Sequence, residues 1–312
     1  MTRIAVLIAA DVDRELLDRI GRDARFDVDY RPVRSEDDLA AAVGGAEVLV
    51  TRHHNKVTPR VLDAARRLRS IVQGTSGLDN IDPSALARGI TIVGLPGENA
   101  NAVAELAIGH MIALTRTVPS YDRMVRAGSW DRDDCSARRE LRGYRLGIVG
   151  IGRVGRSVAR LAAAFGMEPF AYDPYVDAGE IAARGAAKLD ALPLLLESAD
   201  ILTLHVPLTD ETRGMIGAAE IARLPAGAFI INTARGEVLD RAAALAALRE
   251  DRLGGIAMDV FGEEPPRDAW PADPRIILTP HIAGCTREAK ASIGRGVYAR
   301  ICELYGFAPV EP

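Results

Sequence analysis

Three side chains that could act together on a carbonyl compound stand far apart in this 312-residue sequence. They are Arg235 in "NTARGEVLD", Glu264 in "MDVFGEEPP" and His281 in "ILTPHIAGC". A guanidinium can grip a carboxylate with a forked pair of donors, and an imidazole can exchange a proton with an oxygen atom. A nearby carboxylate would fix the tautomer of that imidazole. Taken singly, Arg235 and Glu264 fit loop ion pairs equally well, and a lone histidine fits a hydrogen bond near the core.

The three residues follow apolar runs that predict neighbouring strands. These runs are "GAFIINTA", "GGIAMDV" and "RIILTP", and "RLGIVG", "EPFAYD" and "ADILTLHVP" precede them with helical stretches between. Six strands alternating with helices fit a dinucleotide-type parallel sheet. Because the carboxyl ends of parallel strands face the ligand crevice, we expect the three side chains to converge there.

A glycine-rich turn joins the first of these strands to a helix. In "LGIVGIGRVGRSVARLAAAFG", Gly150 would make the tight turn, Gly152 would let a pyrophosphate approach, and Gly155 would allow close helix–strand packing. Asp173 ends the next strand, 23 positions after Gly150, where a carboxylate meets the adenosine ribose. A carboxylate there repels a 2′-phosphate and no arginine follows it, so we predict NAD rather than NADP.

The chain before this sheet shows a second, smaller alternation. Residues 1–95 contain five short β-branched runs separated by amphipathic stretches, with Ser35 and Thr58 placed as helix N-caps. We therefore expect a doubly wound α/β unit, to which a helix over 286–305 returns. The segment 101–118 is apolar on most of its circumference, which predicts burial against another domain or subunit, with Pro119 ending or bending it. Residues 131–140 are expected to form a loop.

Composition excludes several classes of partner. The net charge is −4 and the pI about 5.8, which gives no reason to expect nucleic acid or an anionic membrane. The first apolar run spans only about seven residues and fits a strand better than a signal peptide, and no run approaches the roughly 18 residues of a membrane span. Three cysteines without CxxC spacing indicate neither a disulfide framework nor a zinc site. We predict no metal and a cytoplasmic location.

Together the motifs resemble the D-isomer-specific 2-hydroxyacid dehydrogenase family, in particular its short phosphoglycerate-dehydrogenase-like members. The resemblance also rests on "GTSGLDNID", "ENANAVAELAIGHMIALTR" and "LHVPLTDETRGMIG", and it covers most of the chain. It implies an α/β fold of two doubly wound parallel-sheet domains. One is a flavodoxin-like substrate domain over 1–98 plus 285–312, and the other is an inserted Rossmann NAD-binding domain over 99–284. It also implies a homodimer, and no regulatory C-terminal domain is expected.

The resemblance gives each matching residue a role. Arg235 would orient the substrate carboxylate and carbonyl, His281 would be the acid/base, and Glu264 its partner, with Glu263 the lesser candidate. The substrate would also meet residues of the first domain. These are Arg52, and Ser76 and Gly77 within a carboxylate-binding loop over 74–77. The cofactor would contact Gly150, Gly152, Arg153, Val154, Gly155, Asp173, Pro207, Thr233, Ala234, Asp259, Ala283, Gly284 and Ser76, with Asp259 at the nicotinamide amide.

The expected activity is NAD-dependent interconversion of a D-2-hydroxy acid and its 2-keto acid. The substrate stays open among phosphoglycerate, glycerate/hydroxypyruvate and glyoxylate types, because side-chain discrimination depends on pocket shape. The alternative is an NAD-sensing, corepressor-like binding protein of the same fold; formate dehydrogenases carry Gln where Glu264 stands. His53 either shapes the substrate pocket or is an exposed loop residue. His110 is expected to be structural and His205 to support the cofactor wall.

Overall fold

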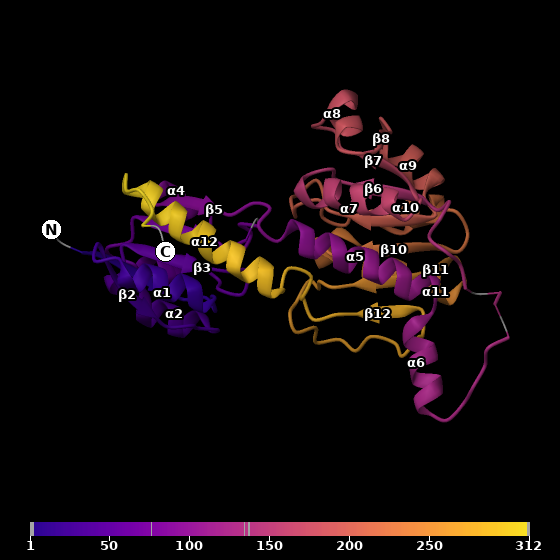
Figure 1. The fold of residues 1–312 in the computed structure, drawn as a ribbon, viewed down its shortest axis with the longest axis horizontal. Coiled ribbons are helices and arrows are strands. Elements are labelled where there is room, and N and C mark those ends of the chain that lie inside the picture. Colours follow the sequence, from indigo (N-terminus) through magenta and orange to yellow (C-terminus); the bar gives the residue numbers. More distant parts are fainter. Residues whose placement is uncertain (1–2, 76, 134, 137, 311–312) are drawn as a thin grey trace. The chain divides into compact units, whose positions relative to one another are not determined.

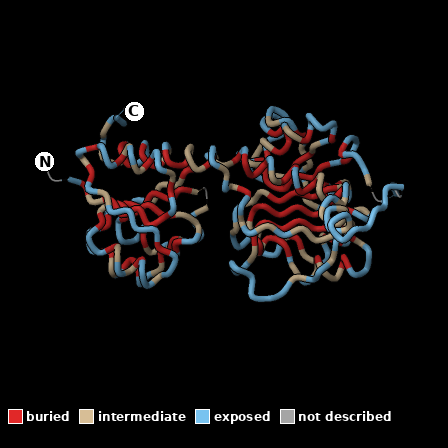
Figure 2. Tube along the Cα trace, turned by 60° about the horizontal axis from the view of Figure 1, so that its bottom comes forward, coloured by how far each residue is buried: buried red, intermediate tan, exposed pale blue. Residues whose placement is uncertain are grey.

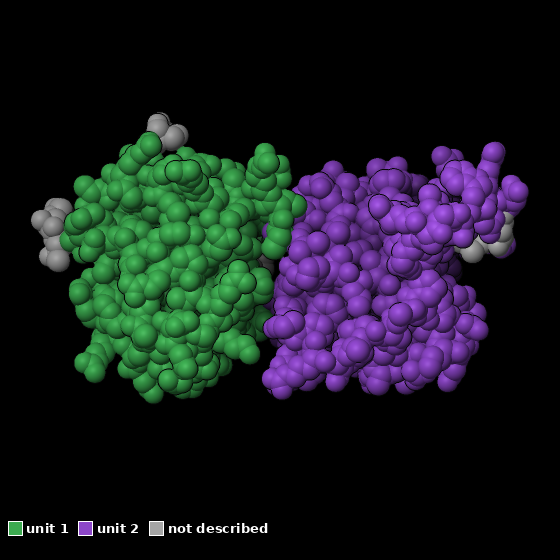
Figure 3. All heavy atoms as spheres, turned by 90° about the horizontal axis from the view of Figure 1, so that it is seen from below, with its two compact units in different colours: residues 1–99, 285–312 green, residues 100–284 purple. Residues whose placement is uncertain are grey.

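The chain separates into two compact units. The computed structural model describes residues 3–75, 77–133, 135–136 and 138–310. One unit comprises Met1–Asn99 with Cys285–Pro312, and the other comprises Ala100–Gly284 (Figure 3). The second unit is thus inserted into the sequence of the first.

The first unit is built on a parallel sheet of five strands. These are β1 (Ile4–Ile8), β2 (Phe26–Tyr30), β3 (Val48–Thr51), β4 (Ser70–Gln73) and β5 (Thr91–Gly94), in the order β2-β1-β3-β4-β5. This is the flavodoxin-like order, so the predicted doubly wound class is confirmed. Along β1, Val6 and Ile8 pack toward α1 (Arg14–Arg22) and α12 (Arg287–Leu304). Leu7 packs toward α2 (Glu36–Ala42) and α3 (Pro59–Ala64). Helices on both faces explain why the central strands β1 and β3 are largely apolar, whereas the edge strand β2 (FDVDY) alternates with charged residues.

The helices of this unit begin where the sequence predicts. The hydroxyl of Ser35 accepts a hydrogen bond from the backbone N–H of Asp38, and that of Thr58 accepts one from Val61. Thr286 caps α12 in the same way, and α12 then packs along α1. Short elements complete the unit, η1 (Val43–Gly45) and α4 (Ser84–Ala87).

The second unit is built on a seven-stranded parallel sheet. Its strands are β6 (Arg145–Val149), β7 (Glu168–Tyr172), β8 (Ala187–Lys188), β9 (Ile201–Leu204), β10 (Ala228–Asn232), β11 (Leu253–Met258) and β12 (Ile276–Leu278), in the order β12-β11-β10-β9-β6-β7-β8. All six predicted strands are present. The additional strand β8 has two residues and lies at the sheet edge, too short to leave a periodic pattern in the sequence.

Helices cover both faces of this sheet (Figure 1). One face carries α9 (Leu192–Ser198), α10 (Ala218–Arg223) and α11 (Arg241–Arg249). The other carries α5 (Ala100–Thr115) and α7 (Arg153–Ala164). The remaining elements are α6 (Val118–Arg126), α8 (Ala178–Ala183) and η2 (Gly236–Val238). In each unit the buried residues follow the strands and the inner sides of the helices (Figure 2). Among the described residues, no helix combines the length and the apolar character needed to cross a bilayer.

The apolar segment 101–118 differs from its prediction. Helix α5 is buried within its own unit, where Ile108 and Met111 join the core formed by β6, β10 and α7. Its apolar circumference therefore needs no other domain or subunit to cover it. Pro119 does not end it: the helix stops at Thr115, and Pro119 lies in the first turn of α6, where a missing N–H costs nothing. The described residues of 131–140 form a loop, as predicted.

A buried tyrosine of α12 binds the loop between α1 and β2 and the C-terminal segment. The hydroxyl of Tyr298 donates to Asp23 Oδ2 (2.9 Å) and accepts from the backbone N–H of Val310 (3.0 Å). Arg25 also binds Asp23, and this ion pair lowers the pKa of the Asp23 carboxyl below its usual value. A buried hydroxyl with two partners is expensive to remove, because both partners lose a hydrogen bond.

We predict that Tyr298→Phe lowers the free energy of unfolding by about 1–2 kcal/mol. Urea denaturation followed by circular dichroism measures it. Tyr175→Phe is the matched control, because Tyr175 is exposed and its hydroxyl binds only Glu211 among the described residues; we expect a change within about 0.5 kcal/mol. Equal effects of the two substitutions would contradict the structural role of the Tyr298 hydroxyl.

Candidate active site

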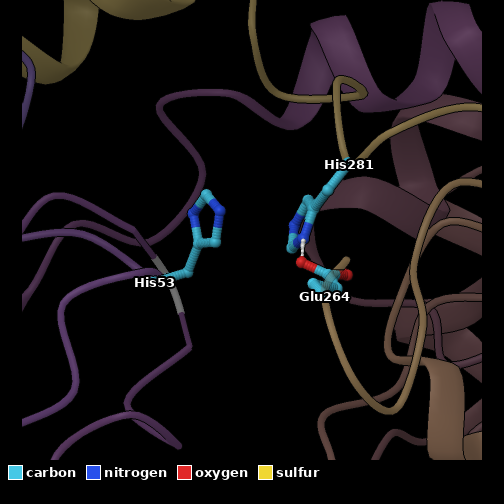
Figure 4. A group of neighbouring side chains, drawn as sticks. All are labelled: His53, Glu264 and His281. Carbon is cyan, nitrogen blue, oxygen red and sulfur yellow. Dashed lines mark hydrogen bonds and ion pairs between the residues drawn. The ribbon is translucent and has the colours of Figure 1, made fainter. Parts of the chain in front are cut away.

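The imidazole of His281 is hydrogen-bonded to the carboxylate of Glu264 (Figure 4). His281 Nδ1 lies 2.7 Å from Glu264 Oε2. Because an ionised carboxylate can only accept, Nδ1 carries the proton, and Nε2 is the ring atom able to take or give another. The second oxygen of Glu264, Oε1, accepts from the backbone N–H of Phe261 (3.1 Å), which fixes the carboxylate in its own loop. Both side chains are half-buried.

The adjacent Glu263 binds an arginine rather than the histidine. Glu263 forms an exposed ion pair with Arg267 (2.6 Å). Of the two adjacent glutamates, the structure therefore places Glu264 against the histidine.

Arg235 follows β10, in a loop shaped by its backbone contacts. Its carbonyl accepts from Asn232 Nδ2 (2.8 Å), and its own Nη1 donates to the carbonyl of Ala234 (2.7 Å). The next residue, Gly236, lies so close to the backbone of Phe261 and Gly262 that a Cβ would overlap them. The loop of Arg235 thus lies against the loop that leads to Glu264, and both emerge from adjacent strands.

The turn that carries His281 is wrapped around Asp259. The carbonyl of Asp259 accepts from the N–H of His281 (2.8 Å). Its carboxylate accepts from the N–H groups of Ile282 at Oδ1 and Ala283 at Oδ2, both at 2.9 Å. His281 itself adopts a left-handed backbone with φ 54°, which costs about 1–2 kcal/mol for a residue with a Cβ. Asp259 therefore stabilises the histidine turn, a role that the sequence did not predict.

The three glycines of the glycine-rich turn serve two different purposes. Gly150 has φ +87°, and a Cβ there would lie 2.9 Å from the carbonyl oxygen of His205. A Cβ at Gly155 would overlap the carbonyl oxygen of Gly150. Gly152 is the N-cap of α7, and a Cβ there would meet no described atom within 4 Å. Two glycines thus serve the packing of the turn, and the third leaves a cradle at a helix N-terminus, where a phosphate is well bound.

Asp173 ends β7 beside this turn. Its Oδ2 accepts from the N–H of Ile151 and its Oδ1 from that of Tyr175, both at 3.1 Å. The carboxylate of Asp173, the predicted ribose ligand, is therefore held against the glycine-rich turn, the predicted pyrophosphate site. The adjoining wall carries little charge, because burial lowers the pKa of His205 to about 3 and keeps that ring neutral at pH 7.

The other residues predicted to contact a cofactor lie along the same edge of the sheet. Thr233 is buried, and its Oγ1 has no hydrogen-bond partner among the residues that the structure describes. A buried hydroxyl of this kind fits a ligand that supplies the missing partner. The remaining predicted contacts follow neighbouring strands or begin the helix after β6. They are Arg153 and Val154 in the first turn of α7, Pro207 after β9, Ala234 after β10, and Ala283 and Gly284 after β12. The donors and the open cradle suit a dinucleotide.

The first unit holds the predicted substrate loop over 74–77 in a network of amides. Gln73 Nε2 lies within hydrogen-bonding distance of Thr75 Oγ1 (2.9 Å), the carbonyl of Gly77 (3.2 Å) and Asn80 Oδ1 (2.7 Å). No motif in the sequence assigns a role to Gln73 or Asn80, although a polar amide at a strand end is a usable signal. Ser76 lies outside the described residues.

Arg52 and His53 follow β3 in the same unit. The backbone N–H of Arg52 donates to Asn55 Oδ1 (2.9 Å), while its side-chain Nε is buried and has no partner among the described atoms. Such a donor suits an anionic ligand. His53 is half-buried, and its ring meets the ring of His54 edge-on, with centroids 5.3 Å apart.

Comparison with known protein families identifies the family of this chain. Residues 108–283 match the family model described as "D-isomer specific 2-hydroxyacid dehydrogenase, NAD binding domain". The chain belongs to the D-isomer specific 2-hydroxyacid dehydrogenase family. Its second unit therefore contains an NAD-binding domain of that family, which agrees with the glycine turn, Asp173 and the open cradle at Gly152.

Relatives of the whole chain support this membership. A D-3-phosphoglycerate dehydrogenase of Archaeoglobus fulgidus is 36% identical across 98% of this chain and 58% of its own length, so the chain spans little more than half of that relative. Among solved structures, one described as a putative D-isomer specific 2-hydroxyacid dehydrogenase from Polaromonas is 28% identical with a TM-score of 0.87, covering 99% of this chain and 98% of that one. D-Lactate dehydrogenase of Aquifex aeolicus, complexed with NAD and lactic acid, is 26% identical with a TM-score of 0.83, covering 97% and 96%.

For this family member, two glycine substitutions should separate binding from folding. Gly152→Ala fills the cradle without touching the protein, so NADH affinity should fall at least about tenfold while the melting temperature stays within about 2 °C. Gly155→Ala is the matched comparison: it forces helix and turn apart and should cost about 1–3 kcal/mol of stability. Fluorescence titration with NADH and thermal denaturation measure the two effects. Unchanged NADH affinity in Gly152→Ala would place the pyrophosphate elsewhere.

Proposed function

We propose that this chain is an NAD-dependent oxidoreductase that interconverts D-2-hydroxy acids and 2-keto acids. The observation that carries the proposal is the hydrogen bond from His281 Nδ1 to Glu264, in a unit that contains the family's NAD-binding domain. A histidine held by a carboxylate through one nitrogen is arranged to exchange a proton through the other.

The proposed chemistry assigns one task to each side chain. Bound NADH supplies the hydride for C2 of the keto acid. His281 gives a proton from Nε2 to the oxygen on C2, and takes one from the hydroxyl in the reverse direction. Glu264 keeps the ring in place and fixes its tautomer through Nδ1. Arg235 holds the substrate carboxylate and draws electron density from the adjacent carbonyl.

Cofactor binding is assigned to the carboxyl edge of the second unit's sheet. The turn over 150–155 and the N-terminus of α7 would hold the pyrophosphate, and Asp173 would bind the ribose hydroxyls, which favours NAD over NADP. The nicotinamide end would meet Asp259, Thr233 and Ala234. Arg153, Val154, Pro207, Ala283 and Gly284 would line the remaining length.

We assign substrate binding in the first unit to Arg52, Ser76 and Gly77. The unpartnered Nε of Arg52 and the amide network under residues 74–77 support an anionic ligand. The substrate is a small 2-keto acid, such as phosphohydroxypyruvate, hydroxypyruvate or glyoxylate. An NAD sensor of corepressor type has no observation in its favour here, whereas the pairing of Glu264 with His281 favours turnover.

The test is a screen of NADH oxidation over these three acids and pyruvate. We expect turnover with at least one, weaker with NADPH, and a fall of about 100-fold or more in kcat/KM for Arg235→Lys. Lysine keeps the charge but loses the fork, so it isolates bidentate binding. NADH binding without turnover of any acid would contradict the proposal and would support a sensor instead.

We also propose a cytoplasmic homodimer, on different grounds from those in the sequence. Because α5 is covered within its own unit, we place the interface on α6 and just after it, where three large apolar side chains are exposed: Val118 (50%), Val125 (49%) and Trp130 (79%). A second copy of the chain would cover these side chains. The lack of CxxC spacing in the sequence suits a reducing compartment.

Analytical ultracentrifugation tests the dimer. The chain should sediment as a dimer at about 10 µM, and Val125→Glu should weaken the association at least about tenfold because it buries a charge. Glu105→Gln, an exposed change on α5, is the control and should leave association unchanged. A monomeric wild-type chain at this concentration would refute the dimer.

A further inference from the structure

A chain of polar side chains runs from the core of the second unit to the turn of His281. His110 Nε2 lies 3.3 Å from Thr279 Oγ1, and Thr279 Oγ1 lies 2.6 Å from Asp259 Oδ1. His110 belongs to α5 and is 4% exposed, and Asp259 is fully buried. Nothing in the chemistry proposed above uses His110, and a histidine is an uncommon choice for a fully buried helix position.

The direction of each hydrogen bond follows from the chemistry of the groups. The Asp259 carboxylate accepts from two backbone N–H groups and is fully buried, so the hydroxyl of Thr279 donates its single proton to it. Thr279 can then only accept from His110, which must donate from Nε2. Burial lowers the pKa of His110, so its ring is neutral at pH 7. A neutral ring that donates from Nε2 has its proton on that nitrogen and none on Nδ1.

We propose that His110 is a positioning residue for His281 that acts through Thr279 and Asp259. The inference rests on the proposed function. Asp259 holds the N–H groups of His281, Ile282 and Ala283, and His281 has a left-handed backbone that persists only where its surroundings define it fully. The hydroxyl of Thr279 orients the carboxylate of Asp259, and His110 in turn orients that hydroxyl. The rigid helix α5 thereby fixes a turn that is remote from it in the sequence.

Substitution of His110 separates this role from simple core packing. His110→Leu keeps the bulk and removes the donor; we expect kcat for keto-acid reduction to fall about fivefold, the size of one hydrogen bond, with KM for NADH within about twofold. His110→Gln retains an N–H donor and should recover kcat to within about twofold of wild type. Thr115→Val is the matched control: it removes a buried hydrogen bond from the same helix, to the carbonyl of Met111, without touching Thr279, and kcat should not change.

A double-mutant cycle tests the route. Thr279→Val should itself lower kcat, and adding His110→Leu to it should change kcat by less than about twofold, because the shared path is already broken. The inference would be overturned if the effects of the two substitutions on kcat multiplied in the double mutant. It would also be overturned by a kcat of His110→Leu within twofold of wild type, or by a failure of His110→Gln to recover kcat.

A spectroscopic measurement decides the hydrogen-bond direction without relying on turnover. Two-bond ¹⁵N–¹H correlation spectra of histidine-labelled wild-type protein, with His110 assigned from its loss in His110→Gln, should show His110 protonated on Nε2 at pH 7.5. Protonation on Nδ1 would overturn the inference even if His110→Leu does not fold. If the wild-type chain reduces no keto acid, the proposed function fails together with the positioning role. If the wild type is active and His110→Leu matches it, only the positioning role fails.

Discussion

A fully buried carboxylate, that of Asp259, imposes the main constraint on the active edge of the second unit. A buried charge must be compensated by donors, since its transfer from water is otherwise very costly. The donors here are a threonine hydroxyl and two backbone N–H groups of the following turn. The same hydrogen bonds therefore compensate the charge of Asp259 and fix the shape of the turn. This turn carries His281.

The parallel sheet explains why residues from distant segments can share one site. Strands β10, β11 and β12 are neighbours in register, so the loops that follow them emerge at the same edge. Gly236 lets the loop of Arg235 lie directly against the loop that ends at Glu264. Glu264 in turn binds both its own loop, at Phe261, and His281. Each functional residue is thus held by contacts within its own loop and with a neighbouring loop.

Much of this arrangement is predictable from local sequence. Both faces of each sheet are covered, so the strands are apolar runs, and their alternation with helices gives the fold class. The N-caps at Ser35 and Thr58 and the glycine turn at 150–155 are local signals of the same kind. Because strand ends share one edge, the alternation also indicates where Arg235, Glu264 and His281 should lie, although their roles remain predictions.

Other features depend on tertiary contacts that no local pattern records. The break between α5 and α6 falls at Arg116 and Thr117, inside the segment that predicts a single helix. The apolar surface of α5 is covered within its own unit. An aspartate after an apolar strand gives no sign that it will wrap the next strand's turn around itself. His110 likewise reads as a core residue until the fold brings Thr279 within reach. In each case the partner lies many residues away, so residue type and spacing do not reveal it.

We propose that His281 transfers the proton when C2 of the substrate is reduced. The most direct measurement is the single-turnover rate of NADH oxidation in His281→Ala, with a keto acid that the wild-type chain reduces and with NADH affinity measured in parallel. We expect a loss of about 100-fold or more in this rate, typical for removal of a general acid, with NADH affinity within about threefold of wild type. A rate within tenfold of wild type, at saturating NADH and keto acid, would contradict it.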